Sequence, residues 1–147
     1  MHTKAGSDRY FPELGANLEE GMHKSKLAGF IIDCRTNDLV AAAGFWSSAL
    51  GMPVRELPGS EGEIYRRLDD AHHGLHIEVQ KVDHPSRVHL DIETNDIEAE
   101  VRRLEKLGAK RVQAIQTWWV MEAPTGQRFC VVRASSPEFD RHASTWS

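Results

Sequence analysis

The chain has 147 residues, of which 40% are hydrophobic and 27% are charged, and its formal net charge is −4. This length and composition are typical of a single soluble globular domain. Without a basic excess to hold a phosphate backbone, nucleic acid is not an expected partner. No apolar run approaches the roughly 20 residues that span a bilayer, so no membrane association is expected. Two cysteines, Cys34 and Cys130, are too few for a secreted disulfide scaffold and favour a cytoplasmic location.

The two ends of the chain differ from its middle. Residues 1–26 are polar and aperiodic and predict a flexible leader, and residues 135–147 predict a loop-like tail. One domain is therefore expected over residues 27–134, with a first module at 27–83 and a second at 86–134.

The first module begins with the apolar stretch "FIIDCR", which predicts a strand, followed by the tripeptide Thr36-Asn37-Asp38. Apolar residues then recur at Leu39, Ala43 and Trp46, the spacing of one helical face. Asn37 or Asp38 is suited to cap the start of this helix, and Gly51 suits its end. Short strands are expected around 54–57 and 63–68, and "GLHIEVQKV" from Gly74 predicts the last strand of the module.

The second module repeats this order. The alternating stretch "VHLDIE" predicts a strand, the tripeptide Thr94-Asn95-Asp96 follows, and apolar positions recur at Ile97, Val101 and Leu104. Leu107-Gly108 mirrors Leu50-Gly51, strands are expected around 111–115 and 118–122, and "GQRFCVVRA" from Gly126 predicts the last strand. The sequence therefore predicts an α+β fold of tandem βαβββ modules. They would form a curved, partly closed, mostly antiparallel sheet with one helix per module.

Polar residues should share one face of this sheet. Strand alternation places apolar residues under the helices, namely Ile77, Val79, Val88, Leu90, Phe129 and Val131. The opposite face then carries Asp33, Arg35, His76, Glu78, Gln80, His89, Asp91, Glu93, Arg128 and Cys130. One interpretation is a face that meets water. The other is a cleft, because His, Glu and Cys occur together with Trp118 and Trp119 nearby.

The stretches "NDLVAAAGFWSSALGMPV", "RVHLDIETNDIEAEVRRLEKLGA" and "WWVMEAPTGQRFCVV" resemble the vicinal oxygen chelate superfamily in its glyoxalase-like branch. The resemblance covers about residues 27–133 and implies paired βαβββ modules. The superfamily contains isomerases, dioxygenases, epimerases, transferases and drug-sequestering proteins. The resemblance therefore implies the fold more than the function.

In the metal-using members, ligands lie on the first and last strand of each module. Carried over to this sequence, the four positions are Ile31, Glu78 (or Gln80 after a register shift), His89 and Cys130. Ile31 has no metal-binding atom, and Cys130 stands where the family usually has glutamate. Glu78, His89 and Cys130 together would suit zinc better than magnesium, and Asp33 or Asp91 could substitute in another register. The alternatives are a buried inert thiol at Cys130 and a hydrogen-bonding wall residue at His89.

Two functions are consistent with this sequence. The first is a lyase or isomerase with a small molecule in a cleft between the modules, where Glu78 and His89 act as catalytic residues with a divalent metal. The second is a metal-free, drug-sequestering binding protein of the bleomycin-resistance type. In either case the expected substrate-binding residues are Asp33, Arg35, Gln80, Asp91 and Trp119. A homodimer is expected, since relatives commonly pair, and a domain that mainly mediates dimerisation is a third interpretation.

Overall fold

The computed structural model describes residues 21–147, which divide into two compact units. Unit 1 is Ala28–Asp91, and unit 2 combines residues 21–27 with Ile92–Ser147. Residues 1–20 of the expected leader lie outside the described residues. Its last residues are not a leader in the structure, because the first strand starts at His23.

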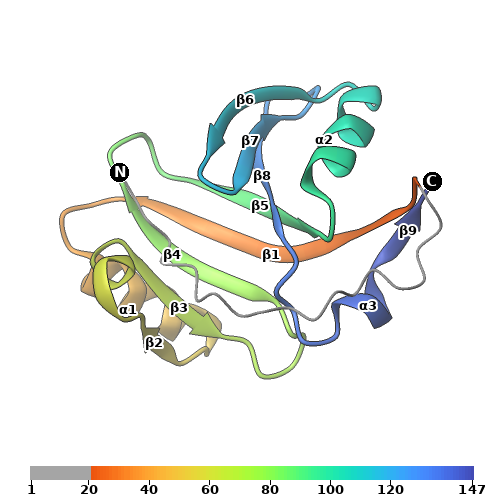
Figure 1. Cartoon of the computed structure of the whole chain (residues 1–147). Helices are drawn as coiled ribbons and strands as arrows, with labels where there is room; N and C mark the ends of the chain where they lie inside the picture. Colours follow the sequence, from red (N-terminus) through yellow and green to blue (C-terminus); the bar gives the residue numbers. More distant parts are fainter. Residues whose placement is uncertain (1–20) are drawn as a thin grey trace. The chain divides into compact units, whose positions relative to one another are not determined.

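Unit 1 contains one βαβββ module (Figure 1). Its elements are β1 (His23–Arg35, beginning in unit 2), α1 (Leu39–Leu50), β2 (Val54–Glu56), the 3-10 turn η1 (Gly59–Glu63), β3 (Tyr65–Asp69), β4 (His76–Val82) and the first residues of β5 (Arg87–Thr94). The strand order is β2-β3-β4-β1-β5, with β1 and β4 parallel and the β2–β3 and β3–β4 pairs antiparallel.

The core of unit 1 lies between α1 and its sheet. The Asp38 carboxylate caps α1 by accepting a hydrogen bond from the Ala41 N–H at 3.0 Å, and Gly51 ends the helix at a φ of 69°. Beneath the helix, Leu39 and Ala43 belong to a buried cluster with Leu68, Ile77 and Val79. The capped tripeptide therefore sets where α1 starts, and the apolar positions Leu39 and Ala43 set which of its faces is buried.

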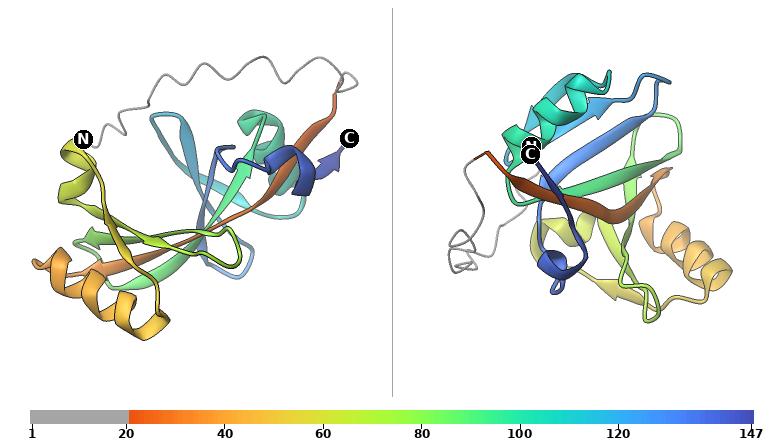
Figure 2. Two further views of the ribbon diagram at one scale, coloured as in Figure 1. Left: turned by 90° about the horizontal axis from the view of Figure 1, so that it is seen from below. Right: turned by 90° about the vertical axis from the view of Figure 1, so that its right-hand side faces the viewer.

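Unit 2 contains the second module and the chain's C-terminal segment (Figure 2). After the end of β5 come α2 (Ile97–Lys106), β6 (Lys110–Ile115), β7 (Trp118–Glu122), β8 (Arg128–Arg133), α3 (Phe139–His142) and β9 (Ser144–Trp146). The strand order is β5-β8-β7-β6, and β9 pairs antiparallel with the first residues of β1. The expected loop-like tail thus holds a short helix and a strand.

The core of unit 2 repeats the plan of unit 1. The Asp96 carboxylate caps α2 through the Ala99 N–H at 3.0 Å. The buried cluster under the helix is made of Val101, Leu104, Met121, Phe129 and Val131. The predicted α+β fold with one helix in each βαβββ module is therefore confirmed. In both copies the helix cap is aspartate rather than asparagine.

One part of the expected core is wrong. Val88 and Leu90 were expected under the helices, but their side chains are 57% and 51% exposed. The reason is that α1 packs on β2, β3 and β4, whereas α2 packs on β6, β7 and β8. Neither helix covers β5 at Val88 and Leu90, so these side chains belong to neither core cluster.

Among residues 21–147, no helix is long and apolar enough to cross a membrane.

Candidate functional site

The face of the unit 1 sheet opposite α1 is polar. Because Ile77 and Val79 point into the core under α1, alternation turns His76, Glu78 and Gln80 to the other face. Register adds the neighbouring strands: on β1, Asp33 lies beside Gln80 and Ile31 beside Glu78, and on β3, Tyr65 lies beside Gln80 and Arg67 beside Glu78. We call this set of side chains the polar face of unit 1.

On the polar face, β5 contributes His89 and β1 contributes Asp33. The His89 Nδ1 lies 2.8 Å from the Asp33 Oδ2, and the Asp33 side chain is only 2% exposed. Since a carboxylate can only accept, Nδ1 carries the proton and Nε2 keeps its lone pair. Nε2 faces Asp91, whose Oδ1 is 3.6 Å away, so a proton gained at Nε2 would face the Asp91 carboxylate while the Nδ1 proton stays on Asp33. With Nδ1 held by Asp33, Nε2 is the ring nitrogen left to accept a proton.

Glu78 belongs to a second chain of hydrogen bonds. The His76 Nδ1 lies 2.6 Å from the Arg67 Nη1, and the His76 Nε2 lies 2.6 Å from the Glu78 Oε1. A guanidinium has only donors, so Nδ1 must accept and Nε2 must donate to Glu78. The Glu78 side chain is 5% exposed, and this donated bond compensates the burial of its charge.

The structure adds three residues, Arg67, His76 and Tyr65, that were not among the predicted site residues. Arg67 donates to His76, and the Tyr65 hydroxyl accepts from the Gln80 amide at 2.9 Å. Burial lowers the pKa of the Arg67 guanidinium. Strand alternation in "YRRLD" could have placed Arg67 opposite the buried Leu68, but the partner across the strands requires the register.

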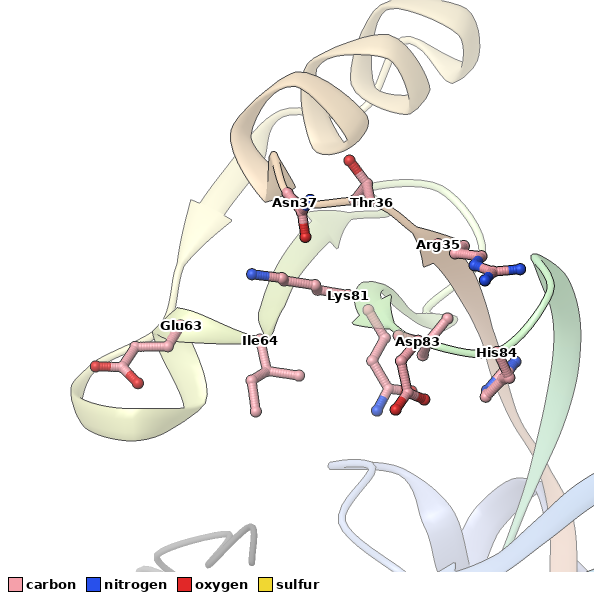
Figure 3. A pocket seen from close by; sticks show the side chains of 10 residues that line it. Arg35, Thr36, Asn37, Glu63, Ile64, Lys81, Asp83 and His84 are labelled. Carbon is pink, nitrogen blue, oxygen red and sulfur yellow. The ribbon is translucent and has the colours of Figure 1, made fainter.

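A pocket of about 780 Å³ lies within unit 1, beside the polar face (Figure 3). It is lined by Arg35, Thr36, Asn37, Glu63, Ile64, Gln80, Lys81, Val82, Asp83 and His84. Two expected substrate-binding residues, Arg35 and Gln80, are among them. Asp33 and Asp91, which were also predicted to bind substrate, are not among the lining residues. Their carboxylates lie beside the two ring nitrogens of His89.

The remaining predicted residues lie in unit 2. Cys130 is a half-buried residue of β8 whose register partner on β7 is Val120. Trp119, a predicted substrate-binding residue, is partly buried against the unit 2 core, and the Arg111 guanidinium lies 5.0 Å from its ring centroid. It shares the helix-facing side of β7 with Met121, so alternation turns Trp118 to the opposite side.

The unit 1 residues do not fit the oxygen-rich metal site of the superfamily. Ile31 is 4% exposed and has no ligand atom. The Glu78 Oε1 already accepts a hydrogen bond from His76, and the His89 Nδ1 is held by Asp33. Ile31 therefore cannot serve as a ligand, whereas the His89 Nε2 still can, because a metal-bound histidine commonly donates its other ring N–H to a carboxylate. The ligand set of Glu78, His89 and Cys130 stays a prediction.

The family model described as "Glyoxalase-like domain" matches residues 29–132, which is more than half of the chain. The chain belongs to the glyoxalase-like domain family. This family assignment agrees with the two βαβββ modules, and it confirms the resemblance to the vicinal oxygen chelate superfamily.

Two solved structures show the same glyoxalase-like fold. A hypothetical protein from Bacillus halodurans C-125 has a TM-score of 0.56 at 10% identity, over 76% of this chain and 95% of that chain. Methylmalonyl-CoA epimerase from Mycobacterium tuberculosis has a TM-score of 0.56 at 16% identity, over 78% of this chain and 91% of that chain. At these identities the likeness extends to the fold alone. No curated protein sequence matches this chain significantly.

Proposed function

We propose that this glyoxalase-like protein binds a small molecule against the polar face of unit 1 and catalyses a proton transfer of the isomerase or lyase type. The observation that carries the proposal is the hydrogen bond of 2.8 Å between the His89 Nδ1 and the buried Asp33 carboxylate. That bond leaves Nε2 as the basic atom. An Asp-oriented imidazole is a common general base, because the carboxylate fixes the tautomer and stabilises the imidazolium.

The chemical step would begin at a carbon-bound proton next to a carbonyl group. His89 Nε2 takes this proton, and the electron pair of the C–H bond moves toward the carbonyl oxygen to give an enolate. Return of the proton to the other face or to a neighbouring carbon gives an isomer, whereas loss of a leaving group with the electron pair gives a lyase product. Glu78, held by His76, is the second proton-transfer group that the polar face offers.

Deuterium exchange tests this function directly. The probes are the hemithioacetal of methylglyoxal with glutathione and, after the similar epimerase structure, methylmalonyl-CoA; incorporation from heavy water is followed by NMR. Wild-type protein should exchange the carbon-bound proton of a substrate, and His89→Gln should abolish the exchange. His72→Gln is the matched control, since His72 is an exposed residue of a turn in the same unit. Wild-type exchange rates in His89→Gln would remove His89 as the base.

A metal-free, drug-sequestering binding protein is the second candidate. The observation that favours it is Ile31, which is buried and has no metal-binding atom. It stands at a position where metal-using members of the superfamily carry a ligand. Metal content of protein purified without chelator or nickel affinity separates the two mechanisms. Near-stoichiometric zinc that disappears in His89→Ala would support a metal-dependent enzyme. Metal-free protein whose tryptophan fluorescence responds to aromatic antibiotics, without any exchange activity, would support sequestration.

A homodimer also stays a proposal. Exposed Val88 and Leu90 on β5 offer apolar surface of the kind that subunit interfaces bury. Light scattering over a dilution series gives the oligomeric state, and a monomer at every concentration would overturn this proposal.

A further inference from the structure

The pocket of unit 1 has the size of a small-molecule site. Its volume of about 780 Å³ falls within the range of ligand pockets. It lies where β1 and β4 end, and the turn at Thr36 and Asn37 forms part of its wall (Figure 3). Neither the proposed proton transfer nor the family assignment gives these residues a role.

The positive charges of the pocket distinguish it from the rest of unit 1. Four of the six lysines and arginines in Ala28–Asp91 have partners: Arg55 binds Asp69, Arg66 the Gly62 carbonyl, Arg67 His76, and Arg87 Asp33. The other two, Arg35 and Lys81, have no side-chain partner among residues 21–147, and both line the pocket. Lys81 is half-buried as a residue and Arg35 is exposed.

The negative charges of the pocket limit which ligands fit it. Glu63 and Asp83 line it as exposed carboxylates. Their lack of a partner does not single out the pocket, because Glu56 and Glu61 elsewhere in unit 1 also have none among the described residues. Two acids beside two cations repel a highly charged polyanion and leave room for a ligand with one anionic group.

The internal repeat shows that the turn at the pocket differs from its counterpart. In unit 2 the Asn95 side chain accepts a hydrogen bond from the Lys24 N–H at 2.8 Å, which fixes the turn to β1. The equivalent residue in unit 1, Asn37, has no side-chain partner among the described residues and lines the pocket. In Figure 3 the Lys81 side chain extends on the side of the pocket where Asn37 lies. An ammonium and an amide together are suitable donors for an oxyanion.

The geometry points to an oxyanion-binding subsite in which Lys81 and Asn37 hold one carboxylate or phosphate group of a small molecule. Exposed Arg35 attracts the ligand to this subsite. Gln80 joins the pocket to the polar face, because it lines the pocket and pairs in register with Asp33, the partner of His89. The substrate class is then a carbonyl compound that carries a carboxylate or phosphate. This last step rests on the proposed function, whereas anion binding in the pocket does not.

Calorimetric titration of the full chain with malonate and, separately, with inorganic phosphate tests the subsite. Saturable binding is expected for at least one of the two anions, and the preferred one identifies the chemical group. Lys81→Gln should weaken binding about tenfold, since a hydrogen bond to a charged group contributes at least that much. Arg35→Gln should weaken it about two- to threefold, as expected for long-range attraction.

Lys110→Gln is the control, because it removes the same charge from an exposed residue of unit 2. Its affinity should equal that of the wild type. Absence of saturable binding of both anions to the wild type, or equal affinities of Lys81→Gln and Lys110→Gln, would overturn the subsite.

The exchange assay separates this inference from the proposed function. Anion binding that depends on Lys81, without proton exchange in the wild type, would sustain the subsite and remove the proton transfer. Proton exchange whose KM for methylmalonyl-CoA is unchanged by Lys81→Gln would sustain the proton transfer and remove the subsite's role in substrate binding.

Discussion

At the scale of single residues, Arg67 determines which nitrogen of His76 carries the proton. Its Nη1 lies 2.6 Å from the His76 Nδ1 and leaves that nitrogen no option but to accept. The other nitrogen, Nε2, must then donate to Glu78. If both nitrogens of His76 were protonated, the Nδ1–H would face an N–H of the Arg67 guanidinium, and two positively charged donors would meet. Arg67 is therefore a positioning residue for Glu78.

Replacement of Arg67 by Gln should release this constraint. We expect nitrogen-15 NMR of His76 to show one tautomer, protonated at Nε2, in the wild type and a mixture in the variant. The free energy of unfolding should fall by about 1–3 kcal/mol, because the half-buried His76 acceptor loses a charged donor. Arg55→Gln is the control: its exposed ion pair with Asp69 should contribute no more than about 1 kcal/mol. A single unchanged His76 tautomer in Arg67→Gln would contradict this role.

At the scale of elements, the parallel pairing of β1 with β4 requires a glycine at position 29. Gly29 lies beside His76 in register, and a Cβ built on it would be 2.0 Å from the His76 carbonyl oxygen. No side-chain movement relieves this clash, because the obstructing atom is main chain. The close approach of these two strands also positions His76 on the polar face.

Gly29→Ala should therefore destabilise the protein by about 3 kcal/mol, as expected for overpacking against a fixed backbone. Gly44→Ala is the matched control, because a Cβ there meets nothing within 4 Å and the position lies within α1. Alanine favours helix over glycine, so this control should stabilise the protein by up to about 1 kcal/mol. Urea unfolding measures both, and equal stabilities of the two variants would contradict the predicted clash.

The C-terminal strand β9 is held to the rest of unit 2 by its pairing with β1 and by the Trp146 side chain. Its indole Nε1 donates to the Ser25 Oγ at 2.8 Å, and the Arg103 guanidinium lies 3.9 Å from its ring centroid. Ser25 and Arg103 both bond to Glu100, so the tail is tied to the buried polar centre of unit 2. This explains why the segment after residue 134 is ordered although its composition predicts a loop.

Removal of the Trp146 side chain should detach β9. Trp146→Ala should cost about 2 kcal/mol of unfolding free energy and increase amide exchange in Ser144–Trp146, since it loses both the cation–π contact and the hydrogen bond. Trp146→Phe keeps an aromatic ring beside Arg103 but loses the hydrogen bond to Ser25, so it should cost only about 1 kcal/mol. Exchange rates in β9 that are unaffected by Trp146→Ala would show that main-chain pairing alone holds the tail.

The elements were more predictable than the site. Helix caps and strand alternation are local, so the repeated tripeptides and "HIEVQ" predicted both modules and placed Glu78 and Gln80 on one face. The partners of these residues were not predictable, because cross-strand register brings Arg67 to His76. The exposure of Val88 was not predictable either, because it depends on which strands each helix covers. In "WW", a shift of one residue decides whether Trp118 or Trp119 faces the core.

At the scale of the whole molecule, the two modules share a fold but use buried charge differently. On the polar face of unit 1, the carboxylates of Glu78 and Asp33 each accept a hydrogen bond from a histidine, His76 and His89 respectively. In unit 2 the carboxylate of Glu100 is fully buried and receives hydrogen bonds from His23, Ser25 and Arg103. These donors come from β1 and α2, so Glu100 joins two elements rather than serving a ligand.

This difference predicts how the protein responds to acid. Burial by itself raises the pKa of the Glu100 carboxyl, but the hydrogen bonds from Arg103, His23 and Ser25 outweigh burial and hold the pKa below its usual value of 4.5. A carboxyl with a depressed native pKa binds its proton more readily in the unfolded chain. Its contribution to stability is therefore complete at neutral pH and is lost as the pH falls from 4.5 through the native pKa.

Glu100→Gln should cost about 3 kcal/mol of unfolding free energy near pH 7, because Arg103 and His23 lose a buried anionic partner. The difference from the wild type should shrink as the pH falls below 4.5 toward the lowered native pKa of the Glu100 carboxyl, where the wild-type side chain also takes up its proton. Glu105→Gln is the control, since its side chain is 40% exposed and its ion pair with Arg111 should contribute at most about 1 kcal/mol. Urea titrations across this pH range measure all three proteins. A Glu100→Gln deficit that stays constant with pH would mean that Glu100 stabilises unit 2 through its shape and hydrogen bonds rather than through its charge.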